Sequence, residues 1–346
     1  MTATTALPRP DLAAYNAARA RQSVLTKPAG SLGVLEDVAC RFAAWQGKTC
    51  PDAIKPAITV FAGDHGVTEE GVSAYPSVVT GEMVKNFVAG GAAICVLARA
   101  LEARLEVVDA GVMSPLDGLP IVHARVRAAS ANLAVGPAMS LSEAQAALDV
   151  GRDAARRAVT AGANLLIAGD MGIGNTTPSA ALICHLAGQD ADAIVGRGTG
   201  IDDATLINKR RVVKQALARL AGQQQDGLTV LAELGGLEIA AMAGFYLEGA
   251  QLGVPSLVDG FIASAAALAA RAIEPTVADW LLASHRSEET GHALALQALG
   301  LTPLVALGMR LGEGSGAAAS VPLLQLAIRL HNEMATFAEA GVTEKA

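Results

Sequence analysis

The feature that most constrains the fold is a repeated order of a short apolar run, a glycine-rich or polar loop and a helical stretch. The runs are apolar on both alternations, which is typical of strands covered by helices on both faces. This order predicts an α/β fold built from parallel β-α-β units. The predicted strands are 58–62, 105–108, 165–168, 256–258 and 304–307, and the predicted helices are 78–103, 142–161, 208–221, 237–251, 262–273 and 317–340.

Both ends of the chain lack this order. The first 50 residues and the segment after Gly316 have mainly helical patterns, and the pattern alone leaves open whether these two ends meet. In a parallel sheet, the loops that follow the strands gather at one edge, where open α/β folds bind ligands. We therefore look for chemistry in those loops.

Composition excludes several classes of protein. Hydrophobic residues make up 52% of the chain, but no uninterrupted apolar stretch reaches the roughly 18 residues that a membrane helix needs, so we expect no membrane insertion. Residues 1–22 contain charged side chains and no apolar block, which argues against a signal peptide and favours a cytoplasmic location. A net charge of −7 and an aromatic content of 3% make nucleic acid a poor candidate partner.

The cysteines give no sign of a metal site or a disulfide framework. They are scattered along the chain without a C-x-x-C pair or a nearby histidine, so we expect reduced, buried thiols. The four are Cys40, Cys50, Cys95 and Cys184.

Three glycine-rich loops are candidates for anion binding, at 169–177, 196–200 and 312–316. Glycine lets backbone N–H groups approach an anion, and a helix N-terminus adds a favourable dipole. In the first loop, Asn175, Thr176 and Thr177 are placed to cap a helix that begins near Pro178. Tight turns without any ligand are the alternative for each loop. Three such loops on one predicted edge favour a nucleotide or phosphate.

The phosphate would be held without a standard nucleotide motif. Neither G-x-x-x-x-G-K-[ST] nor a G-x-G-x-x-G that opens a first β-α unit is present, which argues against a P-loop nucleotidase and an ordinary Rossmann dehydrogenase. Lys209 is a candidate counter-charge, although a lysine in a helix is often simply solvated.

Two acids are candidates for proton transfer. Asp170 and Glu313 each follow an apolar run and lie inside a glycine-rich loop. Partial burial there raises a carboxyl pKa towards the range useful for acid–base catalysis. The alternative is that each acid caps a helix or accepts loop N–H bonds.

Histidine and serine motifs offer weaker hypotheses. His65 follows a predicted strand and is expected to stabilise its loop, and His285 and His292 have no obvious third metal ligand. No H-E-x-x-H is present, so we expect no metal site. Ser315 lies in Gly-Ser-Gly, which lacks the full G-x-S-x-G elbow of a serine hydrolase.

Five motifs taken together carry a resemblance. They are T-K-P-A-G-S-L-G at 26–33, D-H-G-V at 64–67, G-I-G-N-T-T-P at 172–178, D-G-F at 259–261 and M-R-L-G-E-G-S-G at 309–316. In this order the chain resembles the nicotinate-nucleotide:dimethylbenzimidazole phosphoribosyltransferase family over nearly its whole length. The last motif is the most specific part of the resemblance.

The resemblance implies a fold and a reaction. The fold is a Rossmann-like parallel sheet covered by helices on both faces (51–316), with a smaller helical domain from both chain ends (1–50 and 317–346) and the active site between them. The molecule is implied to be a homodimer without a cofactor. The reaction moves 5-phosphoribosyl from nicotinate mononucleotide to 5,6-dimethylbenzimidazole, with inversion, and gives α-ribazole 5′-phosphate and nicotinate in cobalamin nucleotide-loop assembly.

The resemblance also implies roles for residues. Glu313 is the base that removes the benzimidazole ring proton. Asp170 matches the position of a second acid, where the family favours glutamate, so the shorter side chain departs from the family pattern and leaves its role open. The implied phosphoribosyl-binding residues are Gly172, Ile173, Gly174, Asn175, Thr176, Thr177, Gly196, Gly198, Thr199, Gly200 and Lys209; Asp259 is a further substrate-binding residue, and Tyr75, Met83 and Leu311 are implied for the aromatic base.

Three other functions are compatible with parts of the pattern. A sister enzyme would transfer phosphoribose to another acceptor, such as adenine or a phenol, with almost the same motifs. A non-catalytic nucleotide-binding regulatory protein would have no need of Glu313 in an intact loop. A dinucleotide oxidoreductase would carry the Rossmann fingerprint, which is missing.

Overall fold

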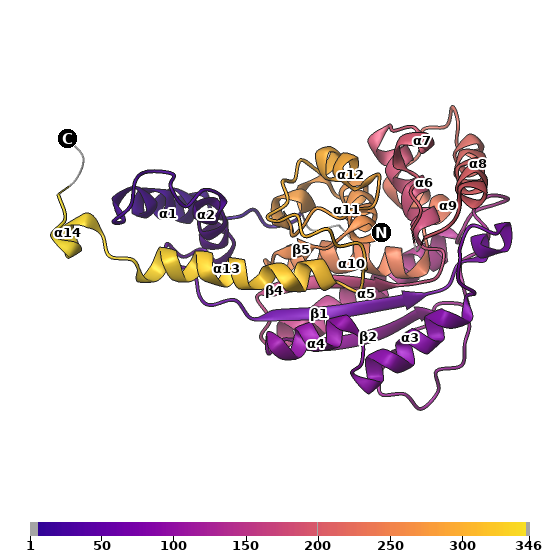
Figure 1. Ribbon diagram of the computed structural model, residues 1–346, viewed down its shortest axis with the longest axis horizontal. Helices are drawn as coiled ribbons and strands as arrows, with labels where there is room; N and C mark the ends of the chain where they lie inside the picture. Colours follow the sequence, from indigo (N-terminus) through magenta and orange to yellow (C-terminus); the bar gives the residue numbers. More distant parts are fainter. Residues whose placement is uncertain (1–5, 199, 344–346) are drawn as a thin grey trace.

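The fold is organised around one parallel sheet. The computed structural model describes residues 6–198 and 200–343. In this part of the chain, six strands pair in the order β3-β2-β1-β4-β5-β6, and all five pairings are parallel. The α/β fold predicted from the sequence is thereby confirmed (Figure 1). The strands are β1 (Pro56–Gly63), β2 (Arg104–Gly111), β3 (Val122–His123), β4 (Leu165–Met171), β5 (Ser256–Val258) and β6 (Leu281–Ala283).

The central strand β1 explains why the apolar runs have no alternation. All eight of its residues are buried, because neighbouring strands pair with both of its edges and helices cover both of its faces. Its register places Ile58 beside Leu105 of β2 and Ile167 of β4. The strand ends therefore line up, and the following loops meet at one edge.

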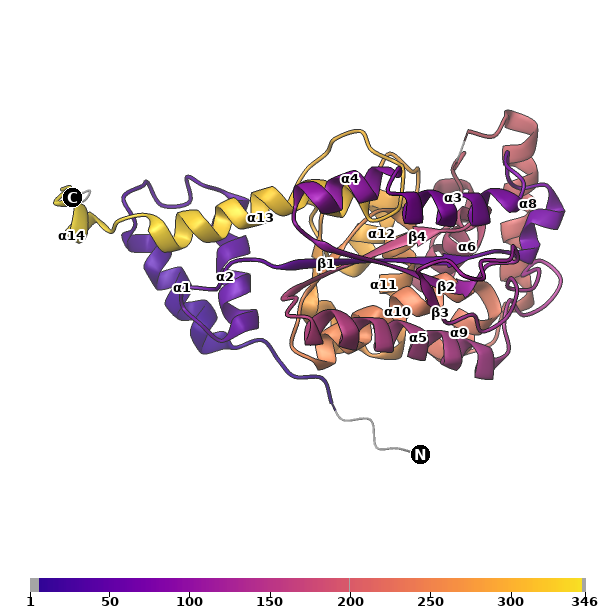
Figure 2. The ribbon, with the colours of Figure 1, turned by 90° about the horizontal axis from the view of Figure 1, so that it is seen from below.

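Helices form a layer on each side of the sheet, as Figure 2 shows edge-on. The helices α3 (Val78–Ala89), α4 (Ala93–Ala100) and α13 (Ser315–Glu333) lie on one side, and α5 (Leu141–Thr160) and α10 (Leu237–Gln251) lie on the other. The remaining helices of this part are α6 (Thr176–Ala187), α7 (Ala191–Ile194), α8 (Asp203–Arg219), α9 (Gly227–Leu234), α11 (Phe261–Ile273) and α12 (His292–Leu299), with short 3-10 helices η1 (Gly66–Glu70) and η2 (Pro275–Trp280).

Three element predictions were wrong in detail. The predicted strand 304–307 is a loop with one bridge, between Val305 and His285, and the sixth strand is β6 instead. The predicted helix 78–103 is interrupted at Gly90, whose φ of 77° is left-handed. The predicted helix 317–340 stops at Glu333, and a short α14 (Phe337–Ala340) follows.

The interruption at Gly90 also bears on membrane insertion. Among the described residues, the segment Val78–Ala100 is long and apolar enough to cross a membrane by length and composition, with a mean hydropathy of 1.4. The fold divides it into helices of 12 and 8 residues, each shorter than the roughly 20 residues that span a bilayer. Both helices lie against the sheet (Figure 2).

The two chain ends meet in a helical part. The helices α1 (Leu12–Val24) and α2 (Val34–Gln46) pack beside the C-terminal half of α13 (Figure 1). Arg21 Nε donates to the carbonyl of His331 at 2.9 Å, and Leu25 bridges to Thr336. The division of the chain into domains at residues 50 and 317 stays a prediction, since α13 runs continuously from the sheet to the helical part.

Candidate functional site

The ends of β4 and β5 and the start of α13 form one cluster. Asp170 lies near the end of β4, Asp259 follows β5, and Glu313 precedes α13. A cavity of about 260 Å³ opens beside them. It is lined by Tyr75, Asp170, Asn175, Thr176, Gly198, Gly260, Phe261, Ile262, His285, Ser287, Glu289, Arg310, Leu311 and Gly312.

Gly169 lets the Glu313 loop pack directly on β4. A Cβ at Gly169 would lie 2.3 Å from the carbonyl oxygen of Glu313, which is backbone that cannot swing aside. Glu313 itself has a φ of 63°, and Gly312 and Gly314 on either side are also left-handed. A left-handed non-glycine residue is uncommon and costs energy, so surrounding contacts must hold it there.

Asp170 is buried beside the cavity. Its Oδ2 accepts a hydrogen bond from Asn175 Nδ2 at 2.9 Å. Burial raises the pKa of Asp170 to about 8, and the nearby carboxylate of Asp259 acts in the same direction. A carboxyl group in this state can hold or release a proton near neutral pH.

The Glu313 carboxylate turns towards α4. Its Oε2 accepts a hydrogen bond from the backbone N–H of Ile94 at 3.3 Å. Burial raises the pKa of Glu313, while the hydrogen bond from Ile94 lowers it. Glu313 does not line the 260 Å³ cavity, although its neighbours Leu311 and Gly312 do.

Asp259 holds the start of α13 with one of its carboxylate oxygens. It is 1% exposed, and its Oδ1 accepts from the N–H of Ala317 at 2.7 Å. Burial raises its pKa to about 7, and the N–H groups at the start of α13 lower it. One carboxylate oxygen of Asp259 is thus engaged by the first turn of α13, while Oδ2 has no hydrogen-bond partner among the described residues, and substrate binding by Asp259 stays a prediction.

The loop from Gly172 to Thr177 is tightly packed. A Cβ at Gly172 would lie 2.3 Å from the carbonyl oxygen of Gly63, so no larger residue fits. Ile173 donates its N–H to Thr80 Oγ1 at 3.0 Å, and Gly174 is left-handed with a φ of 90°.

The capping prediction for this loop was wrong. The helix α6 begins at Thr176, and Asn175 occupies the N-cap position without making a side-chain cap bond. Its side chain points to Asp170 instead. Thr177 is fully buried, whereas Asn175 and Thr176 line the cavity.

Lys209 lies beneath the second glycine-rich loop. It is 1% exposed, and its Nζ donates to Thr176 Oγ1 at 2.7 Å and to the Gly196 carbonyl at 3.4 Å. Burial lowers the pKa of Lys209 to about 8, partly offset by the charge of Glu289. A buried cation between two glycine-rich loops is suited to an anion such as phosphate. Gly198 lines the cavity, and Gly200 lies two residues further along the chain. Thr199 lies outside the described residues.

The three residues expected to contact an aromatic base are not equally placed. Tyr75 and Leu311 line the cavity and are 52% and 57% exposed. Met83 lies on α3 and packs against the core without lining the cavity.

Four polar residues of the cavity were missed from the sequence. His285, Ser287 and Glu289 follow β6, which was not predicted as a strand because, unlike β5, it is not directly followed by a loop that contains glycine. Arg310, whose Nη1 donates to the Gly198 carbonyl at 3.3 Å, was part of the quoted M-R-L-G-E-G-S-G motif but received no role. The position of Ser287 and Glu289 directly after a strand was the available signal.

His65 supports the first glycine-rich loop from below. Its Nε2 lies 2.7 Å from Glu238 Oε1, and both side chains are fully buried. Burial lowers the pKa of His65, but the charge of Glu238 outweighs it and the net shift is upwards. The described residues contain no group of three or more His, Cys, Asp and Glu side chains that could hold a metal ion.

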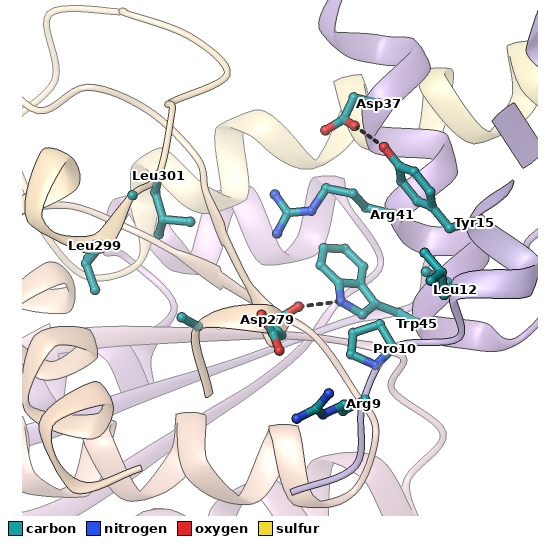
Figure 3. A pocket seen from close by; sticks show the side chains of 13 residues that line it. Arg9, Pro10, Leu12, Tyr15, Asp37, Arg41, Trp45, Asp279, Leu299 and Leu301 are labelled. Carbon is teal, nitrogen blue, oxygen red and sulfur yellow. Dashed lines mark hydrogen bonds between the residues drawn. The ribbon is translucent and has the colours of Figure 1, made fainter. Parts of the chain in front are cut away.

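A larger cleft of about 650 Å³ lies elsewhere, between the helical part and the α/β part. Figure 3 shows Arg41, Trp45 and Asp279 on its walls. Trp45 Nε1 donates to the Asp279 carbonyl at 2.9 Å, and Arg41 Nη2 donates to the Leu281 carbonyl at 2.7 Å. These bonds join the two parts of the chain. The described residues that line the cleft include none from the three glycine-rich loops.

The placement of the site differs from the one that the resemblance implied. Glu313 lies at the start of α13, and the helical part packs on the far half of that helix. A helix of 19 residues is about 28 Å long, so the two ends are well separated. Within one chain, the candidate site therefore does not lie between the α/β part and the helical part.

Comparisons with known proteins agree over nearly the full length. A family model described as phosphoribosyltransferase matches residues 7–342. The nicotinate-nucleotide–dimethylbenzimidazole phosphoribosyltransferase of Chromobacterium violaceum is 72% identical over 335 residues, which cover 97% of each chain. The protein of the same name from Ectopseudomonas mendocina is 54% identical over 336 residues, which cover 97% of this chain and 96% of that one. A crystal structure of such an enzyme from Thermus thermophilus has a TM-score of 0.92 and 49% identity, and the match covers 97% of this chain and 100% of that chain.

Proposed function

This chain belongs to the nicotinate-nucleotide–dimethylbenzimidazole phosphoribosyltransferase family, and we propose that its cluster of strand ends is the active site of that reaction. The enzyme is a phosphoribosyltransferase, a glycosyltransferase that moves a pentosyl group. Its reaction transfers 5-phosphoribosyl from nicotinate mononucleotide to 5,6-dimethylbenzimidazole in the assembly of the cobalamin nucleotide loop. The products are nicotinate and α-ribazole 5′-phosphate.

The observation that carries the site assignment is the meeting of two buried acids at Gly169. The Glu313 backbone packs on Gly169, and the next residue along β4 is Asp170. A Cβ at Gly312 would lie 3.1 Å from Asp170 Oδ2, which places the two loops in direct contact. Both carboxyl groups have pKa values raised by burial.

The chemistry requires one base and no acid at the leaving group. The nicotinate ring leaves as a neutral pyridine nitrogen, so it needs no proton. The benzimidazole attacks through one ring nitrogen and must lose the proton on the other. Glu313 removes that proton in its ionised form.

Asp170 has a different role in this proposal. Positive charge develops on the ribose as the bond to nicotinate breaks, and Asp170 stabilises it in its ionised form. Because burial raises the pKa of Asp170 to about 8, this role requires that the cationic pyridinium ring of the bound donor lowers that pKa. The shorter aspartate reaches less far than glutamate, and its bond from Asn175 fixes its direction. Asp170 also lines the cavity, which Glu313 does not.

The phosphoribosyl group is bound by the glycine-rich loops and Lys209. The phosphate lies against the N-terminus of α6, where Asn175 leaves the first-turn N–H groups without a side-chain cap. Lys209 supplies the positive charge from below. Tyr75 and Leu311 line the cavity and form the wall that contacts the aromatic base, and Met83 is a further proposed base-contact residue although it does not line the cavity.

Attack on the face opposite to nicotinate inverts the anomeric centre from β to α. This stereochemistry requires Glu313 and the donor-binding loops to lie on different sides of the ribose. The anomeric configuration of the product is a direct check.

The enzyme is further proposed to be a cytoplasmic homodimer. Four free cysteines, three of them buried, fit a reducing compartment. An active site between an α/β part and a helical part requires the helical part of a second copy, because the two are separated within one chain. Light scattering at micromolar concentration distinguishes a dimer from a monomer.

The test uses purified protein, nicotinate mononucleotide and 5,6-dimethylbenzimidazole. Chromatography follows nicotinate and α-ribazole 5′-phosphate, and NMR coupling constants assign the anomer. Coupled appearance of both products in equal amounts supports the proposal. Release of nicotinate only when adenine or a phenol replaces the benzimidazole would assign a different acceptor, and no release with any acceptor would reject the proposed catalysis.

A further inference from the structure

The N-terminus of α4 lacks a capping side chain. Its N-cap residue is Ala92, with φ −75° and ψ 159°, the extended conformation that N-cap residues adopt. Some helices of this fold have acceptors there, such as Asp11 for α1, Ser140 for α5, Asp202 for α8 and Asp226 for α9, whereas α2, α3, α6 and α10 to α13 share with α4 the lack of a side-chain cap. The first turn of α4 therefore has N–H groups that its own sequence does not satisfy.

Glu313 supplies the missing acceptor from far along the chain. The N–H of Ile94, the second residue of α4, donates to Glu313 Oε2 at 3.3 Å, across a separation of 219 residues. The next N–H, that of Cys95, bonds to the carbonyl of Ala92 at 3.1 Å. Ile94 is 0% exposed and Glu313 is 5% exposed, so water does not readily replace this bond.

The Glu313 backbone is held independently of α4. Ser315 Oγ donates to the Gly312 carbonyl at 2.7 Å, and the Asp259 carboxylate accepts from Ala317. Gly169 supports the same segment from β4. The contact with α4 is therefore made by the carboxylate alone, and it determines where that group points.

We propose that the uncapped N-terminus of α4, through the Ile94 N–H, positions the Glu313 carboxylate and keeps it ionised for proton removal. The proposal rests on Glu313 being the base of the proposed function. Ala92 is then favoured at the N-cap position because a capping side chain there would compete with Glu313 for the N–H groups.

The surroundings of Glu313 make this contact significant. Burial raises the pKa of Glu313. Among the described residues, the hydrogen bond from the Ile94 N–H lowers it, and the positive end of the α4 dipole acts in the same direction. Asp170 on β4 and Cys95 on α4 are the titratable groups that sense its charge. Asp170 opposes ionisation when it is charged, and the Cys95 thiol, whose own pKa is raised, stays neutral near pH 7.

The direct test removes the N–H with Ile94→Pro. This N–H is one of the first four of the helix, so no bond within α4 is lost, and proline is tolerated in a first turn. Ile94→Ala is the matched control, because it also shortens the buried side chain but keeps the donor. We expect the Glu313 pKa to rise by about one unit in Ile94→Pro and to stay nearly unchanged in Ile94→Ala.

Two readouts are used. The first is a ¹³C NMR titration of glutamate-labelled protein, with the Glu313 signal identified by its loss in Glu313→Gln. The second is the pH profile of kcat/KM, whose acid limb should move upwards by the same amount while KM for nicotinate mononucleotide changes less than about twofold. Equal titrations and profiles for the proline and alanine variants overturn the proposal and leave the contact a structural one.

Ala92→Ser tests the same idea where Ile94→Pro does not fold. The serine oxygen provides a local cap, which should raise Tm by about 1–2 °C and lower kcat/KM at neutral pH by about threefold to tenfold. Ala92→Gly is the control, since it suits the N-cap position without adding an acceptor. A serine variant with higher Tm, unchanged kcat/KM and an unchanged Glu313 titration contradicts the proposal.

If Glu313→Gln keeps wild-type turnover, the assignment of Glu313 as the base fails separately from this proposal. The NMR titration still measures the effect of α4 on the Glu313 pKa in that case.

Discussion

The large cleft and the proposed site at the strand ends differ in how well their volume indicates a ligand-binding site. The cleft, of about 650 Å³, is more than twice as large as the 260 Å³ cavity beside Asp170. Two of its side chains join the two parts of the chain: Trp45 donates to the Asp279 carbonyl (Figure 3), and Arg41 donates to the Leu281 carbonyl. The smaller cavity is surrounded by glycine-rich loops and buried charges. The proposed site therefore lies at the smaller cavity, and cavity size is not the criterion that selects it.

The two regions also differ in the free-energy cost of burying charged and polar groups. The strand ends bring together Asp170 and Asp259, whose pKa values burial raises to about 8 and about 7. Tyr246 lies close to both acids. Neither its hydroxyl group nor Asp259 Oδ2 has a hydrogen-bond partner among the described residues. Such groups destabilise a fold, and they are therefore expected mainly at functional sites. In the cleft, Tyr15 donates to Asp37 and forms an ordinary surface interaction.

The largest expected effect is on turnover. Glu313→Gln should lower kcat by about 10²–10⁴-fold, because the amide cannot accept the benzimidazole proton. Binding of nicotinate mononucleotide should change little, and calorimetry measures it. Arg41→Gln is the matched substitution in the cleft, and we expect its kcat/KM to stay within about twofold of wild type. Equal losses in the two variants would remove the distinction between the regions.

A smaller effect is expected on the binding of nicotinate mononucleotide, the phosphoribosyl donor. Lys209→Met keeps the length of the buried side chain but removes its charge, so KM for nicotinate mononucleotide should rise by about 10–100-fold. The KM for dimethylbenzimidazole, which has no phosphate, should move much less. Steady-state kinetics with each substrate varied in turn measures both, and a parallel rise in the two constants would argue against a phosphate contact.

The next effect is on stability and depends on pH. The folded state holds the Asp170 proton up to about pH 8, whereas the unfolded chain loses it near pH 4, so the free energy of unfolding should fall as pH rises between these values. Asp170→Asn removes this dependence and should stabilise the protein at pH 8 by about 1–2 kcal/mol while lowering activity. Urea denaturation at about pH 5 and about pH 8 tests it. A variant that is less stable than wild type at both pH values would show that the ionised carboxylate is well accommodated.

The smallest effect on catalysis is expected in the cleft. Trp45→Phe removes the bond to the Asp279 carbonyl and part of the ring, which should lower the free energy of unfolding by about 1–2 kcal/mol. The pH profile of kcat/KM should be unchanged, since α2 lies at the far end of α13 from Glu313. A changed profile would mean that the helical part acts on the site, either within one chain or from the partner subunit of the proposed dimer.

Local patterns in the sequence predicted most of the sheet and much of the site. The runs at 58–62 and 165–168 are longer than a turn and apolar on both faces, so they indicate buried parallel strands without further information. The glycine-rich loops and the acids within them were visible for the same reason, because both belong to one continuous segment. Strand β6 was not predicted, although β5 has the same length of three residues and was, because Asp259 and Gly260 directly follow β5 whereas no glycine follows β6 before Gly291.

Contacts between distant segments were decided only by the tertiary structure. The sequence by itself determined that Glu313 lies in the glycine-rich loop 312–316, because this is a property of one continuous segment. It did not determine that this carboxylate reaches Ile94, that Asp259 holds the start of α13, or that Ser287 and Glu289 face the cavity. These arrangements depend on which strand ends become neighbours and on how closely Gly169 lets the loops approach. Such distances arise from packing the whole sheet, and no single segment contains them.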